Sequence, residues 1–151
     1  MLTRVLDAPQ ERVWAAVSDA DHLAAWLGPV AGRLEISQVV DLAGAVVEIV
    51  GCRPPQRLEL RWTLMGETND LRLDLRPVGG GTEVTIEHAG LVSPAAVGYG
   101  PSWEERLGHL AEHLAGLPVP QHDCAAMLAR LQPPWWALLS PSDRQAIGLP
   151  P

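Results

Sequence analysis

The feature that most constrains the fold of this chain is a strict alternation of apolar and polar residues in three successive segments. The segments are RLELRWTL (57–64), DLRLDLR (70–76) and TEVTIEH (82–88). Side chains alternate between the two faces of a strand, so this pattern predicts an antiparallel meander with one wet and one dry face. Parity places Trp62 and His88 together on the dry face. The opposite face mixes arginines with acids, which predicts weak cross-strand ion pairs.

The residues before the meander predict further small elements. LTRVLDA (2–8) is typical of a short strand, and PQERVWAAVSD (9–19) and DHLAAWLG (21–28) predict two short adjacent helices. Alternation in RLEISQVV (33–40) and the apolar run AVVEIVGC (45–52) predict two more strands. The sequence therefore predicts a short strand, two helices that form a compact V, and two further strands before the meander.

The last strong element is an amphipathic helix that begins near Pro101 and runs through SWEERLGHLAEHLAGL (102–117). Its apolar residues fall on one stripe at helical spacing, which comprises Trp103, Leu107, Leu110 and Leu114. About 15 helical residues are long enough to cross the dry face of the sheet. The tail, residues 118–151, predicts two more short helices, the second capped by Ser140, around an apolar Trp135-Trp136 cluster.

Composition excludes several classes of function. The net charge of −7 gives no basic footprint for nucleic acid or an anionic membrane, and all eleven cationic side chains are arginine. Without lysine, the chain has no Schiff-base nucleophile and no phosphate-loop lysine. Cys52 and Cys124 form no CxxC, no signal-peptide pattern opens the chain, and no apolar run reaches the ~20 residues of a membrane span. We therefore expect a cytoplasmic protein.

Four blocks of sequence, in this order, resemble one known family. They are DAPQERVWAAVSDADHLAAWLG, RPPQRLELRW, GGGTEVTIEHAGL and YGPSWEERLGHLAEHL. The chain resembles the START-like, helix-grip (SRPBCC) superfamily, in the bacterial branch named after the activator of heat-shock-protein ATPase homologues. The resemblance implies an α+β helix-grip fold: a curved antiparallel sheet wrapped around a long C-terminal helix, with two short helices after the first strand. The stretch between Trp26 and Trp62 is short for the family, so we expect one early strand to be trimmed or replaced.

The resemblance also implies a cavity between sheet and long helix, used elsewhere in the superfamily for apolar molecules. Residues 1–117 would form this ligand-binding domain, and residues 118–151 an extension that packs on the domain or on a second subunit. We expect the ligand to be held by residues of the dry face and the long helix: Trp62, Leu64, Leu73, Ile86, His88, Tyr99, Trp103, Leu107 and Leu110. Large side chains at Trp62 and Trp103 are equally suited to filling the core.

Two groups of residues are candidates for chemistry. The ordinary pKa of histidine suits proton transfer near neutrality, and a tyrosine can donate a hydrogen bond. His88 and Tyr99 are therefore the catalytic candidates, although a histidine at a strand end is commonly structural. His109 and His113 have metal-binding spacing, but a helical wheel puts them off the apolar stripe, which predicts a solvated flank. No Rieske or iron motif is present. We therefore expect neither a cofactor nor a metal.

Three functions remain open. The first is binding of a small, largely apolar molecule for sequestration, resistance or transport. The second is a cofactor-free cyclase, dehydratase or isomerase on a polyketide-like substrate, with His88 and Tyr99 moving protons. The third is a chaperone-interaction module. The apolar tail also suggests a homodimer contact.

Overall fold

The computed structural model describes residues 1–91 and 93–150, with side chains at 93 and 94 left out. Seven strands form one antiparallel sheet in the order β1-β7-β6-β5-β4-β3-β2. The strands are β1 (Leu2–Leu6), β2 (Val30–Ala31), β3 (Val39–Leu42), β4 (Ala45–Arg53), β5 (Arg57–Leu64), β6 (Glu67–Val78) and β7 (Gly81–Ala89). The predicted α+β helix-grip architecture is confirmed, and β2 has only two residues.

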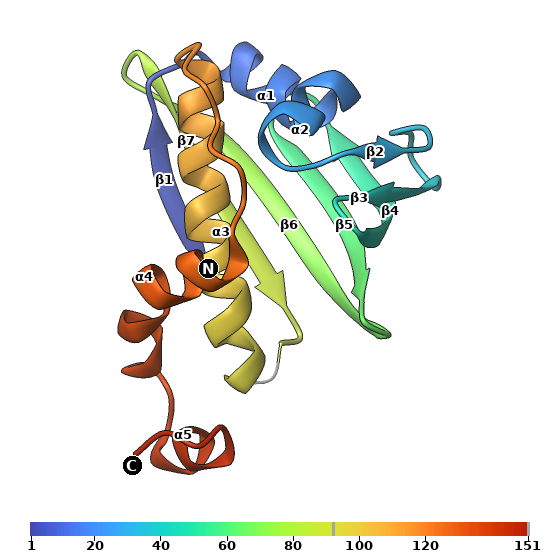
Figure 1. Cartoon of the computed structure of the whole chain (residues 1–151). Helices are drawn as coiled ribbons and strands as arrows, with labels where there is room; N and C mark the ends of the chain where they lie inside the picture. Colours follow the sequence, from blue (N-terminus) through green and yellow to red (C-terminus); the bar gives the residue numbers. More distant parts are fainter. Residues whose placement is uncertain (92, 151) are drawn as a thin grey trace.

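The first three helices lie against the inner face of the curved sheet, whereas the last two contact the third helix and lie away from that face (Figure 1). The helices are α1 (Gln10–Ser18), α2 (Ala20–Trp26), α3 (Ser93–Leu114), α4 (Cys124–Trp136) and α5 (Pro141–Ala146). The long α3 lies along β1 and β7, while α1 and α2 lie across one end of the sheet (Figure 1). Asp19 caps α2 by accepting from the backbone of Asp21 and His22, and Ser140 caps α5. The cap at Ser140 was predicted.

The strand register confirms the dry face. Leu71 on β6 lies opposite His88 on β7, and Asn69, two residues before Leu71, lies opposite Trp62 on β5. Trp62 and His88 therefore share one face of the sheet. A contiguous core of buried apolar residues forms between this face and the helices, with Trp103, Leu107 and Leu110 of α3 within it.

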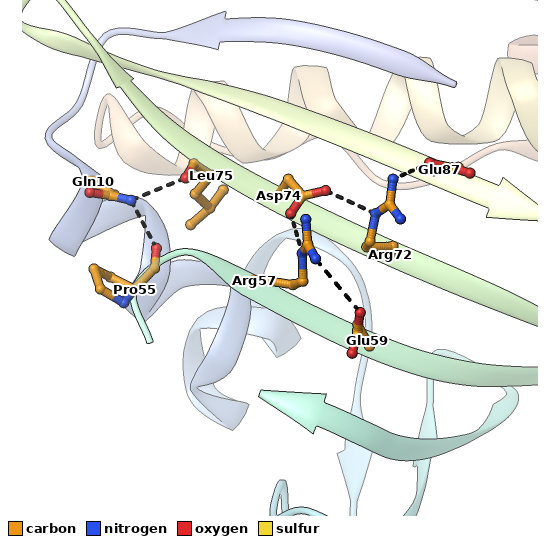
Figure 2. A network of polar contacts seen from close by, with 8 residues as sticks. All are labelled: Gln10, Pro55, Arg57, Glu59, Arg72, Asp74, Leu75 and Glu87. Carbon is orange, nitrogen blue, oxygen red and sulfur yellow. Dashed lines mark hydrogen bonds and ion pairs between the residues drawn. The ribbon is translucent and has the colours of Figure 1, made fainter. Parts of the chain in front are cut away.

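The outer face carries the predicted ion pairs. Arg57 and Arg72 both bond to Asp74, at 2.6 and 2.9 Å, and Arg72 also pairs with Glu87, so that four side chains connect β5, β6 and β7 (Figure 2). All four are partly exposed, so each pair contributes only about 0–1 kcal/mol. The network makes the outer face polar, and none of its charged groups is fully buried.

The strand predicted over residues 33–40 does not form. Only its last two residues enter β3, because the chain turns at Ser37, whose φ is +64°. The Ser37 amide donates to the carbonyl of Ile49, and the Gln38 amide donates back to Glu35. Leu34 to Ile36 therefore form a loop beside the sheet.

The long helix begins eight residues before the predicted start, at Ser93, and contains Pro101 in its interior. Proline has no N–H to donate to the carbonyl four residues earlier, which belongs to Val97. Gln132 of α4 replaces this donor: its Nε2 donates to the Val97 carbonyl at 2.9 Å. A contact from a distant segment therefore satisfies the helix where its own sequence cannot. At the other end, Gly116, with φ +72°, follows the last turn of the helix and terminates it.

No helix among the residues that the structure describes is long and apolar enough to cross a membrane.

Candidate functional site

An apolar chamber of about 490 Å³ lies between the sheet and the helices. Its floor is the inner face of β3 to β7, and its roof comes from the α1–α2 pair and α3. The floor residues are Leu42, Val47, Ile49, Cys52, Leu58, Leu60, Trp62, Leu71, Leu73 and Ile86. The roof residues are Val17, Ser18, Leu23, Trp26, Leu27 and Trp103. A sheet wider than the helix that covers it leaves this space open.

Few polar groups reach the chamber wall, and most of them are already paired. The indole of Trp26 donates to the carbonyl of Ala16 at 2.8 Å, and that of Trp103 donates to His88 Nδ1 at 3.1 Å. The Trp62 indole N–H is buried and has no partner among the described residues. A chamber of this kind favours molecules with little charge.

The exposure of the wall residues locates the mouth of the chamber. Glu35, Ile36 and Pro54 are exposed, Ile36 with 57% of its surface, whereas the floor at Val47 and Ile49 is buried. The mouth therefore lies between the 34–36 loop and the turn that joins β4 to β5. An exposed carboxylate, Glu35, stands at this mouth.

Contacts between helices hold the roof in place. Arg106 Nη1 of α3 donates to the Leu27 carbonyl at the end of α2, at 2.6 Å. His22 of α2 and His113 of α3 lie with ring nitrogens 2.8 Å apart. Burial, His22 and Arg12 together lower the pKa of His113, which favours a neutral His113 ring in this contact. The α1–α2 roof is therefore fixed to α3 by polar contacts as well as by packing.

Four of the predicted ligand residues line the chamber, namely Trp62, Leu73, Ile86 and Trp103. Leu107 and Leu110 are buried in the core beyond the chamber wall, and Leu64 packs half-buried at the end of β5. The remaining two, His88 and Tyr99, lie elsewhere.

His88 and Tyr99 lie together, behind the Trp103 indole. Their ring centroids are 4.4 Å apart, and the two line a separate pocket of about 200 Å³. His88 Nδ1 accepts the Trp103 hydrogen bond, while its Nε2 is buried without a partner among the described residues. Burial lowers the pKa of His88 to about 4, so the ring is neutral at pH 7 with its proton on Nε2. Burial likewise raises the pKa of Tyr99.

The expectation of a solvated flank at His109 is wrong. Its residue surface is only 6% exposed, and its Nδ1 is buried without a partner among the described residues. The helical wheel placed it off the apolar stripe, but β1 and the chain between α3 and α4 border that side of α3. Within the described ranges, no group of three potential metal-ligating side chains comes together.

Sequence reasoning missed the roof and the mouth of the chamber. Leu23, Trp26 and Leu27 are spaced three and four apart in the second short helix, a pattern that indicates one apolar face. That signal was available and was not used. The contributions of Cys52 and of the 34–36 loop had no such signal. Cys52 faces the chamber because the register of β4 on β5 shifts between Ile49 and Gly51, and the loop depends on the turn at Ser37.

Comparison with family models matches residues 7–115, more than half of the chain, to the family described as Activator of Hsp90 ATPase homolog 1-like protein. The chain belongs to this family. The family match and the helix-grip fold together place this chain in the START-like superfamily that its sequence resembles. No curated protein is similar enough to count as a match. Residues 116–151 lie beyond the matched region.

Several solved structures have folds similar to that of this chain. The crystal structure of CalU16 from Micromonospora echinospora is 29% identical with a TM-score of 0.79, covering 90% of this chain and 84% of that chain. DynU16, from the dynemicin biosynthetic locus, is 23% identical with a TM-score of 0.70, covering 80% and 48%. The Aha1 dimer from Colwellia psychrerythraea is 15% identical with a TM-score of 0.64, covering 76% and 97%. The last two likenesses show the fold alone.

Proposed function

We propose that this family member binds a small, largely apolar molecule in the chamber under the α1–α2 roof. The observation that carries the proposal is the chamber itself: about 490 Å³ of space with an apolar wall and an opening at one side. Ligand pockets typically enclose about 300–1,000 Å³ and bury most of the ligand surface. Each square ångström of apolar ligand surface removed from water contributes about 25 cal/mol to binding.

The polar groups of the chamber narrow the class of ligand. No arginine lines the wall, and the carboxylate of Glu35 stands at the mouth, so an anionic head group would find no counter-ion there. The buried Trp62 N–H makes no hydrogen bond of ordinary geometry, but it lies beside the Tyr99 hydroxyl, whose pKa is raised by burial and lowered by this contact, so it adds no open donor to the chamber. A neutral, largely apolar molecule fits these constraints.

Proton transfer by His88 and Tyr99 is the second candidate function, because their rings are in contact. Two features favour binding over catalysis. The pair lies behind Trp103 and outside the chamber wall, and a histidine with a pKa of about 4 is a weak base at neutral pH. A neutral Nε2–H is better suited to donating a hydrogen bond.

Binding of the neutral dye N-phenyl-1-naphthylamine tests the proposal. Cys52 lines the chamber and Val46 points outward from the same strand, 48% exposed, so Cys52→Trp fills the space and Val46→Trp is its matched control. We expect dye fluorescence to rise with wild type and Val46→Trp, and the Kd to rise at least about tenfold with Cys52→Trp. Equal affinity for the three proteins, with circular dichroism showing all of them folded, would overturn the proposal.

A further inference from the structure

The segment beyond the matched family region contacts α3 at several specific points. Trp135 of α4 packs on Gly100, where a Cβ would lie 2.5 Å from three atoms of the indole ring. Its Nε1 donates to Glu104 Oε1 at 3.1 Å, one helical turn further along α3. Together with the bond from Gln132 to the Val97 carbonyl, these contacts fix α4 against α3. Gly100 is therefore the residue that admits the Trp135 ring.

Trp135 forms one wall of the 200 Å³ pocket that contains His88 and Tyr99. The other walls come from β1 at Leu2, from β7 at Ile86 and from α3 at Trp103. The pocket thus exists only where the C-terminal segment packs on the helix-grip domain. Ile86 and Trp103 also line the large chamber, so the two spaces share a wall.

His88 provides a hydrogen-bond donor in this pocket. Its Nδ1 accepts the Trp103 indole hydrogen, so in the neutral ring the proton is on Nε2. That N–H is buried with no partner in the described part of the chain. An unsatisfied buried donor destabilises the fold, and a ligand oxygen that accepts from it would recover this cost.

We propose that this pocket is a second binding site, which takes a neutral ring-sized molecule bearing one carbonyl oxygen that accepts a hydrogen bond from His88 Nε2. A dry apolar cavity of about 150 Å³ is enough for benzene, so 200 Å³ accommodates a six-membered ring with a short substituent. The aromatic faces of Tyr99, Trp103 and Trp135 provide stacking surfaces. This site is separate from the large chamber, and it depends on residues outside the matched family region.

Acetophenone and ethylbenzene form a matched probe pair, because they share a ring and differ in the carbonyl. Binding is followed by nitrogen-15 NMR of the histidine rings. We expect acetophenone to bind at least about tenfold more tightly than ethylbenzene and to shift the Nε2 resonance of His88. Equal affinity of the two probes, or an unmoved His88 resonance, would overturn the proposal.

Variants of the C-terminal segment and of the helix it packs on provide the second part of the test. Trp135→Ala removes the wall, and Trp136→Ala changes the neighbouring tryptophan, which does not line the pocket. We expect Trp135→Ala to abolish acetophenone binding and Trp136→Ala to retain it. Gly100→Ala, which displaces the Trp135 ring, should weaken binding even if Trp135→Ala folds poorly. Retained binding in folded Gly100→Ala and Trp135→Ala would contradict the proposed site.

The Cys52→Trp variant separates this proposal from the function proposed above. It fills the large chamber and leaves the smaller pocket untouched, so acetophenone should still bind. If Cys52→Trp removed acetophenone binding, the probe would lie in the large chamber; the second site would then be wrong while the first proposal stood. Loss of dye binding alone leaves the second site intact.

Discussion

At the scale of single residues, strand parity predicted the neighbours of His88 but not its chemistry. Alternation along β5 and β7 placed Trp62 and His88 on one face, and the structure confirms this. The hydrogen bond from Trp103, which fixes the tautomer of His88, depends on how α3 is rotated about its axis. Sequence periodicity predicts which stripe of a helix faces inward but not which atom each side chain meets.

The pKa of His88 predicts a specific loss of stability in acid. Its folded-state pKa is about 4 and the ordinary value is 6.5, so between these pH values the unfolded chain holds a proton that the folded chain lacks. The free energy of unfolding therefore falls as pH drops from 6.5 towards 4. His88→Gln keeps a neutral acceptor and donor and does not titrate, so its stability should fall less over this range.

Urea unfolding of wild type and His88→Gln at pH 7 and pH 4.5 measures this difference. The other titrating groups are common to both proteins and cancel in the comparison. We expect the free energy of unfolding of the variant, relative to that of wild type, to be higher at pH 4.5 than at pH 7. If the difference in the free energy of unfolding between the two proteins is the same at both pH values, His88 has an ordinary pKa in the folded protein.

At the scale of elements, local sequence predicted the strands of the meander and the helix caps, and it failed where a distant segment decides the structure. Pro101 indicated a helix start, because proline is favoured in the first turn and disfavoured in the interior. Gln132, thirty-one positions later, makes the interior position possible. Similarly, the alternation over 33–40 was outweighed by the turn at Ser37 and its bond to Ile49.

A double-mutant cycle tests the role of Gln132. Gln132→Leu leaves the Val97 carbonyl without its donor, and we expect the free energy of unfolding to fall by about 1–3 kcal/mol. In a Pro101→Ala background the backbone N–H of residue 101 can donate to Val97, so the same change should cost less. We predict a coupling of about 1 kcal/mol between the two positions. An additive cycle, measured by urea unfolding, would contradict this account of the helix.

At the scale of the whole molecule, the resemblance predicted the fold and a cavity, and the structure has both. The volume of the cavity could not be predicted, because it depends on how far α3 lies from β4 and β5 and on where α1 and α2 sit. Three further expectations stay predictions: the cytoplasmic location, a homodimer through the C-terminal segment, and the boundary after residue 117. The outward-facing Leu138, 75% exposed, is the apolar residue of that segment most open to a partner.

The two cysteines allow the most direct test of the central claim, that the chamber receives a small apolar molecule from solution. Cys52 lines the chamber, and Cys124 is exposed on α4 and serves as a reference within the same molecule. Mass spectrometry follows alkylation of each thiol by N-ethylmaleimide, with and without saturating N-phenyl-1-naphthylamine. The account predicts that the dye slows alkylation of Cys52 at least about tenfold and leaves Cys124 unchanged. An unchanged rate at Cys52 would contradict it.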